Sequence, residues 1–200
     1  MEEKKGSNGK LAILIACISI VVLALLLVGI IVFFNKPKEV VNENKTGGSV
    51  SLSYTDKKNV LSIVGATPLE DGVAIKDLTG DNYFEFSVET KLKEASEVDY
   101  EIAIKKNTAA STIADKDIKI YLEKENSGSY AKVFGPEKFT GLKKASELGT
   151  KKGEMVLTNV TNRKSIVENY RLKIWLSSTA VPSETANSYS IEILLNGKAK

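Results

Sequence analysis

The stretch YRLKIWL, residues 170–176, decides the fold because core-type and surface-type side chains alternate along it. Its even-numbered positions are aromatic or aliphatic, and the odd-numbered ones are Arg171, Lys173 and Trp175. Successive side chains of a β-strand point to opposite faces, so this period of two predicts a strand with one buried and one solvated face. One-sided strands of this kind are typical of antiparallel sheets.

The same alternation recurs along the chain and sets the fold class. The alternating or β-branched stretches are 60–64, 84–92, 100–104, 118–122, 130–134, 155–160 and 189–195. We therefore predict an all-β domain over residues 50–200, an antiparallel β-sandwich of Ig-like or jelly-roll type with about 7–8 strands. Between Leu142 and Leu148 we expect a single helical turn lying over one end of the sandwich.

A long apolar run near the N-terminus predicts a membrane anchor. The 24 residues from Leu11 to Phe34 include no charged side chain, and as a helix they would span roughly 36 Å, more than a hydrocarbon core of about 30 Å. We expect a short tail at 1–10, a transmembrane helix acting as a signal anchor at 11–34, and a polar linker at 35–49. Two alternatives stay open, a cleaved secretory signal and a lipoprotein signal in which Cys17 is lipidated.

The orientation of this anchor is predicted from the character of the domain. Each flank of the run carries three lysines, so the positive-inside rule does not choose between the two orientations. The domain is rich in Ser, Thr, Asn and Lys and contains no cysteine. We expect a single-pass protein of the cell membrane with its C-terminal domain outside the cell, and the lipid bilayer as one partner.

Several chemistries are excluded by composition. The chain has no histidine, and its one cysteine lies in the apolar run, so catalytic triads, thiol catalysis and histidine-ligated metals are excluded from the domain. No Gly-rich phosphate loop occurs, and a net charge of +3 without a basic stripe does not favour nucleic acid. We expect no catalytic residue, cofactor or metal, and therefore no enzyme.

Two loops carry oxygen ligands that could suggest a cation site. Asp115-Lys116-Asp117 begins like a calcium loop, but Lys119 and Ile120 occupy the positions of a ligand and of the turn glycine. We expect an ordinary solvated loop there. A site built from Asp77, Asp81 and Asn82 is an alternative, because sandwich loops hold calcium with side chains distant in sequence.

The solvated face of residues 170–176 is the candidate contact surface. Arg171, Lys173 and Trp175 share it, and Trp175 is the sole tryptophan of the chain. An exposed tryptophan on the same face as two cations could receive a protein or glycan ligand. The alternative is that the predicted helical turn or a neighbouring loop covers Trp175.

Residues 84–104, with the strand opening DYEI at 99–102, and YRLKIWL at 170–176 resemble a group of uncharacterised surface proteins of Gram-positive-type bacteria. These have an N-terminal anchor and one β-sandwich, and are distantly similar to the camelysin and biofilm-fibre family. The resemblance covers residues 65–196 in strand order and implies a surface location. The protease activity attached to camelysin is not implied here, because histidine and a metal-ligand set are missing.

These observations predict a non-catalytic binding, adhesion or envelope-structural module on a membrane anchor. A fibre or assembly subunit of the biofilm-matrix kind is a second hypothesis. A carboxylate-dependent glycan-acting enzyme is a third and weaker one, because no spacing singles out two of the acids.

Overall fold

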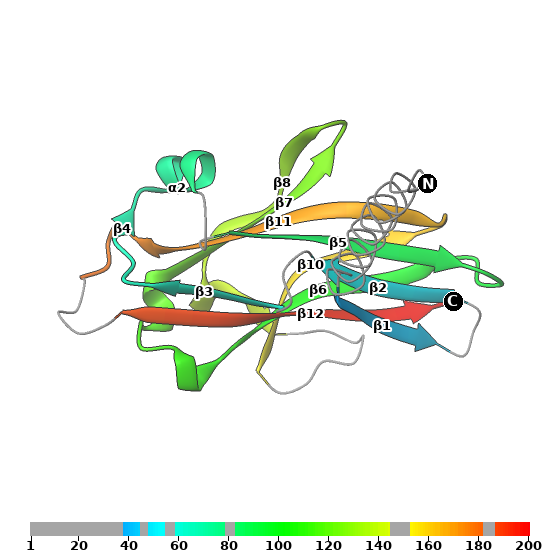
Figure 1. Cartoon of the computed structure of the whole chain (residues 1–200), viewed down its shortest axis with the longest axis horizontal. Coiled ribbons are helices and arrows are strands. Elements are labelled where there is room, and N and C mark those ends of the chain that lie inside the picture. Colours follow the sequence, from blue (N-terminus) through cyan, green and yellow to red (C-terminus); the bar gives the residue numbers. More distant parts are fainter. Residues whose placement is uncertain (1–37, 45–47, 55–58, 79–82, 145–152, 182–186) are drawn as a thin grey trace, which may run out of the picture. The chain divides into compact units, whose positions relative to one another are not determined.

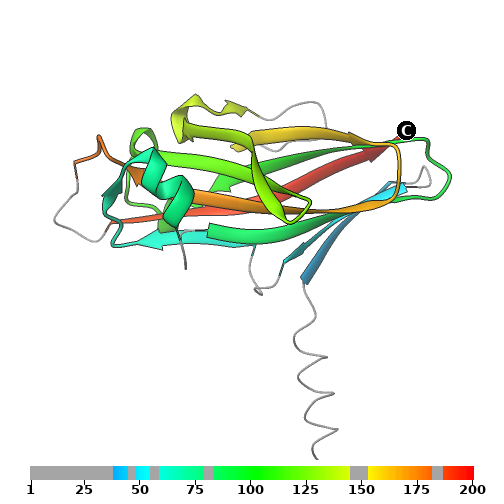
Figure 2. The ribbon, with the colours of Figure 1, turned by 90° about the horizontal axis from the view of Figure 1, so that it is seen from above.

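The alternating stretches form two antiparallel sheets in the computed structural model of the chain (Figures 1 and 2). The structure describes residues 38–44, 48–54, 59–78, 83–144, 153–181 and 187–200. Residues 37–200 make up one of two compact units of the chain. The predicted β-sandwich is therefore confirmed.

The larger sheet contains seven strands, six of them in the order β1-β2-β5-β11-β7-β8. Their bounds are β1 Lys38–Asn44, β2 Gly48–Tyr54, β5 Tyr83–Leu92, β11 Ile166–Ser177, β7 Ile118–Asn126 and β8 Ser129–Lys138. The seventh, β4 (Pro68–Leu69), pairs in parallel with the end of β11. All other pairs in this sheet are antiparallel.

The smaller sheet has five strands in the order β3-β12-β6-β10-β9. Their bounds are β3 Val60–Val64, β12 Ser188–Ala199, β6 Val98–Lys106, β10 Glu154–Asn162 and β9 Lys143–Lys144. The short helical elements are α2 (Asp71–Asp77) and the 3-10 turns η2 (Thr108–Ala110), η3 (Asp115–Asp117) and η4 (Phe139–Gly141). The described residues form twelve strands, more than predicted. Three of the added strands show no period of two, because β4 and β9 have two residues each and β1 is a polar edge strand. The fourth, β2, does alternate, at Val50, Leu52 and Tyr54, and the prediction missed it.

One hydrophobic core joins the inner faces of the two sheets. It includes the alternating positions of β11 and of β7, with Leu172, Ile174, Ile120 and Leu122 fully buried. The aromatic rings of Tyr54, Phe84, Phe86 and Tyr170 follow one another across the larger sheet, with centroids 5.6, 6.0 and 5.5 Å apart. The period of two therefore predicted the buried face correctly.

The predicted linker at 35–49 is wrong for most of its length. Residues 38–44 form β1, which pairs along its whole length with β2, and β2 itself begins at Gly48. β1 is an edge strand that pairs only with β2, and its sequence KEVVNEN shows no period of two from which a strand could be predicted. The predicted helical turn is also wrong at Leu142, which follows η4, and at 143–144, which form β9; residues 145–148 lie outside the described residues.

The membrane-anchor residues Leu11, Cys17 and Phe34 lie outside the described residues. Within the part of the chain that the structure describes, no helix is both long and apolar enough to cross a membrane.

Candidate functional site

The predicted contact surface of β11 is covered at its C-terminal end by α2 (Figure 1). Trp175 is only 1% exposed and packs in a small cluster with Ala74 of α2 and Tyr121 of β7. The prediction of an exposed tryptophan is therefore wrong, because the outer face of the strand is buried by a helix. The alternative, that Trp175 is covered, is confirmed, although α2 covers it and not the predicted turn at 142–148.

Lys173 is buried under the same helix, so its predicted exposure is wrong too. The side chain is 4% exposed, and its Nζ donates a hydrogen bond to the carbonyl oxygen of Ile75. The same Nζ lies 3.2 Å from Oε2 of Glu123, which makes an ion pair without the alignment of a hydrogen bond. A buried ammonium needs such partners, because an unpaired one would lose its hydration without compensation.

Arg171 remains at the surface and belongs to a different arrangement. Its Nη2 and Nε lie 2.6 and 2.9 Å from Oε1 of Glu85. Its guanidinium carbon lies 3.9 Å from the centre of the Tyr130 ring and 5.3 Å from that of Tyr83. Burial, and after it the charge of Glu85, raises the pKa of Tyr130, so this phenol stays protonated and can donate.

Next to Arg171, one row of polar side chains runs across five neighbouring strands on the outer face of the larger sheet. The strand register places Ser53, Ser87 and Asn169 side by side and places Glu125 beside Tyr130, while a hydrogen bond joins Asn169 to Glu125. Ser87 Oγ donates to Asn169 Oδ1 at 2.6 Å, and Asn169 Nδ2 donates to Glu125 Oε2 at 2.6 Å. The β7–β8 hairpin that carries Tyr130 rises from the sheet at the end of this row (Figure 1).

A groove of about 310 Å³ follows this row, and we call it the outer-face groove. Its lining residues are Ser53, Tyr54, Glu85, Phe86, Ser87, Tyr130, Asn169 and Tyr170. Hydroxyl, amide and carboxylate groups next to an aromatic ring can bind a ligand that carries both hydroxyls and apolar C–H faces. Of the predicted contact residues, only Arg171 borders the groove, through Glu85 and Tyr130.

A second polar arrangement lies inside the sandwich, and we call it the sheet-bridging cluster: Thr90, Tyr100, Lys124, Asn162, Glu168 and Tyr170. Its centre is Glu168, whose side chain is 5% exposed. Lys124 Nζ donates to its Oε1, while Tyr100 Oη and Asn162 Nδ2 lie 2.6 and 2.8 Å from its Oε2. Thr90 accepts a further hydrogen bond from Asn162 at 3.0 Å.

The cluster shifts the pKa values of its members in opposite directions. Burial alone would raise the pKa of Glu168, but the hydrogen bonds from Lys124, Tyr100 and Asn162 outweigh it and lower the pKa. Burial raises the pKa of Tyr170 to about 12 and raises that of Tyr100 further. Glu168 is therefore an anion that two neutral phenols and one ammonium surround at neutral pH.

The alternation in the sequence contains a signal for this cluster. Lys124 lies two positions after Leu122, and Glu168 lies two positions before Tyr170, so both are in phase with core residues. The predicted strands at 118–122 and 170–176 end just short of them. A charged residue in phase with a buried face is the feature that sequence reasoning missed.

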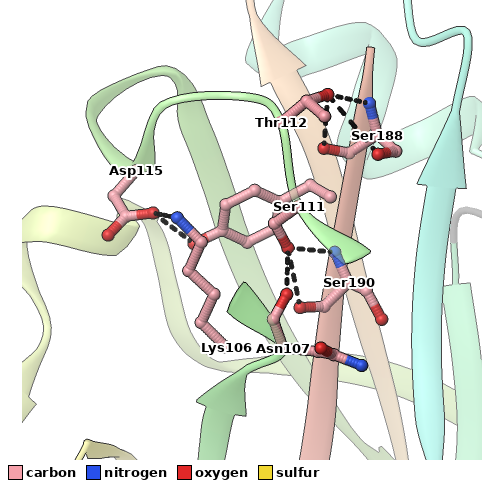
Figure 3. A network of polar contacts seen from close by, with 8 residues as sticks. Lys106, Asn107, Ser111, Thr112, Asp115, Ser188 and Ser190 are labelled. Atoms are coloured by element: carbon pink, nitrogen blue, oxygen red, sulfur yellow. Dashed lines mark hydrogen bonds and ion pairs between the residues drawn. The ribbon is translucent and has the colours of Figure 1, made fainter. Parts of the chain in front are cut away.

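The two loops with oxygen ligands differ in outcome. Asp115 lies 2.5 Å from Lys106 Nζ and accepts a hydrogen bond from the Tyr189 hydroxyl at 3.0 Å, while Ser111 and Thr112 hold the same loop to β12 (Figure 3). Its carboxylate is thus used to fasten the loop. In the alternative site, Asp81 and Asn82 lie outside the described residues, and within the described ranges no three His, Cys, Asp or Glu side chains gather to hold a metal.

Comparison with known proteins does not place the chain in a family. No family model matches it, and neither does any curated protein. Among solved structures, the chain shares 11% sequence identity and a TM-score of 0.27 with AvmM, which catalyzes macrocyclization in alchivemycin A biosynthesis. That match covers 77% of this chain and 80% of the other, and a likeness at this TM-score carries no argument about fold or activity.

Proposed function

We propose that the chain is a single-pass, membrane-anchored cell-surface protein whose β-sandwich binds a glycan strand without catalysis. The outer-face groove is the observation that carries the binding proposal. The uncharged run from Leu11 to Phe34 supports a transmembrane helix, and the absence of cysteine from a domain rich in Ser and Thr fits an extracellular location. An Ig-like or jelly-roll topology belongs to the same proposal.

A glycan suits this groove better than an extended peptide does. The groove lies over β2, β5 and β11, and each of these strands is paired on both sides. Backbone groups are therefore not free to add a peptide strand, which is how sheet edges usually capture peptides. Binding must come from side chains, and Ser87, Asn169 and Glu85 line the groove with hydroxyl, amide and carboxylate groups.

The charges of the groove argue against a polyanion. Arg171 is the cation next to it, and both of its bonded nitrogens point to the same oxygen of Glu85. Glu125 accepts from the neutral amide of Asn169. Glu85 and Glu125 thus place two carboxylates beside the one cation of Arg171. This balance favours a neutral glycan over one rich in phosphate or uronate.

The test is binding of the full chain, purified in detergent micelles, to an array of neutral and anionic polysaccharides, followed by calorimetry on the ligands retained. Replacing Asn169 with Leu removes the centre of the hydrogen-bonded row, and we expect affinity for a neutral polysaccharide to fall about tenfold, equivalent to about 1.4 kcal/mol. Val167→Leu is the matched control, since Val167 lies two residues away on the same exposed side of β11. Failure of every polysaccharide to bind, or equal binding by Asn169→Leu, would contradict the proposal.

A further inference from the structure

The sheet-bridging cluster holds an amine and a carboxamide on one buried carboxylate. Lys124 Nζ donates to Oε1 of Glu168, and Asn162 Nδ2 lies 2.8 Å from Oε2 of the same group. The amine and the carboxamide therefore meet on one carboxylate, each at a different oxygen. Proximity of this kind replaces a chance encounter between two groups with a step inside one site.

The arrangement joins strands of different sheets. Lys124 lies on β7 of the larger sheet, next to Tyr170 of β11, whereas Asn162 is the last residue of β10 in the smaller sheet. Glu168 lies on β11, two residues before Tyr170, so the carboxylate reaches the amine from the neighbouring strand and the carboxamide from the opposite sheet. The groove proposed for glycan binding makes no use of Lys124, Asn162 or Glu168.

We propose that Lys124 and Asn162 become joined by an intramolecular amide bond across the two sheets, with Glu168 moving the protons. The bond would be a self-made covalent cross-link in a domain without disulfides. It goes beyond ligand binding, because it is a modification of the chain by its own residues.

The reaction balances without an oxidant or a cofactor. Oε1 of Glu168 takes one proton from the Lys124 ammonium along the existing hydrogen bond, and the neutral Nζ attacks Cγ of Asn162. The Cγ–Nδ2 bond then breaks. Glu168 carries the two protons from Nζ to Nδ2 in turn, so Nδ2 departs as ammonium and Glu168 ends as a carboxylate.

The surroundings suit a slow reaction that occurs once in each molecule. Glu168 is a weak base, since its neighbours stabilise its anion, but a single turnover during maturation does not require a fast rate. Tyr100 fixes the carboxylate through its hydroxyl, 2.6 Å from Oε2. The Lys124 side chain is 37% exposed, which leaves the departing ammonium a route to solvent.

The test is the mass of the full chain, purified in detergent micelles. We expect the wild-type chain to be lighter than its sequence by about 17 Da, the mass of one ammonia lost when an amine acylates. Tryptic digestion should leave the chain uncut after Lys124 and should yield one branched peptide that contains Lys124 and Asn162. A wild-type mass equal to that of the sequence, or cleavage after Lys124, overturns the proposal without the need for any variant.

Three variants test which residues cause the loss of mass. Lys124→Arg and Glu168→Gln should both retain the full mass, whereas Lys106→Arg, the matched control on another ion-paired lysine, should still lose about 17 Da. Cyclisation of Asn162 onto the backbone nitrogen of Arg163 would also release ammonia. A mass loss that persists in Lys124→Arg would therefore show that reaction and refute the cross-link.

Discussion

Replacing Lys173 with Met should destabilise the domain far more than a substitution on an exposed strand face does. The change removes the cation from beside Glu123, whose side chain is 9% exposed, and takes the donor away from the carbonyl oxygen of Ile75. Breaking a buried pair by removing one partner costs about 3–5 kcal/mol, because a charge is left without compensation. The lost hydrogen bond to Ile75 also weakens the docking of α2. Its cost is included in the estimate of about 3–5 kcal/mol.

Arg171→Met is the control, two residues away on the same strand and the same face. Its ion pair with Glu85 is 28% exposed on the arginine side and 43% on the glutamate side. Exposed pairs contribute up to about 1 kcal/mol, and contact with Tyr130 adds about 0.5–1 kcal/mol. We therefore expect the free energy of unfolding to fall by about 1–2 kcal/mol in Arg171→Met, well short of the loss in Lys173→Met.

Urea unfolding of a fragment of residues 37–200 measures both losses. The double variant Lys173→Met, Glu123→Leu removes the stranded carboxylate, so its stability should return to within about 1 kcal/mol of wild type. If Lys173→Met costs no more than Arg171→Met, or if the double variant is less stable than the single one, the burial of this pair beneath α2 is refuted.

Three more outcomes are expected. Gly135→Ala should unfold the domain at a much lower urea concentration than Gly128→Ala does. Both glycines have a φ near +80°, but an added Cβ at 135 would lie 2.3 Å from the Ile120 carbonyl oxygen, whereas one at 128 would have no atom within 4 Å. Equal losses of stability in the two variants would contradict this. Because the folded-state pKa of Glu168 is lowered, its contribution to stability is present above an unfolded value of about 4.3 and is lost as pH falls through the folded one. Glu168→Gln should therefore flatten the acid side of a stability–pH curve, and an unchanged slope would count against the cluster. Protease added to intact cells should cleave the domain and leave a cytoplasmic marker whole; protection until lysis would reverse the proposed orientation.

The period of two predicted which residues form the core, but it could not predict what covers the outer face. Trp175 lies opposite Leu172 and Ile174, as parity requires, yet it is buried because α2 packs over it. Parity assigns a residue to a face of the sheet, whereas burial depends on segments distant in sequence. The seven residues of α2 are too few to show a helical period.

Two of the strands were missed for different reasons: β2 alternates plainly at Val50, Leu52 and Tyr54 and could have been predicted, whereas β1 could not. β1 is held by main-chain pairing with β2 at the edge of the sheet, and its polar sequence KEVVNEN has no alternating apolar side. The groove was missed because it depends on register across five strands, from Ser53 to Tyr130, which a single sequence does not specify. The sheet-bridging cluster, in contrast, could have been found by extending the alternation to Lys124 and Glu168.

The position of the one tryptophan makes fluorescence a probe of a single event, the docking of α2. Trp175 lies beneath α2, and a helix of seven residues is not stable unless it is docked. Its fluorescence will therefore follow the docking of α2 rather than the melting of the sheets. An early shift in emission, ahead of the loss of β-type circular dichroism, would register the opening of this helix as a separate event with its own free energy.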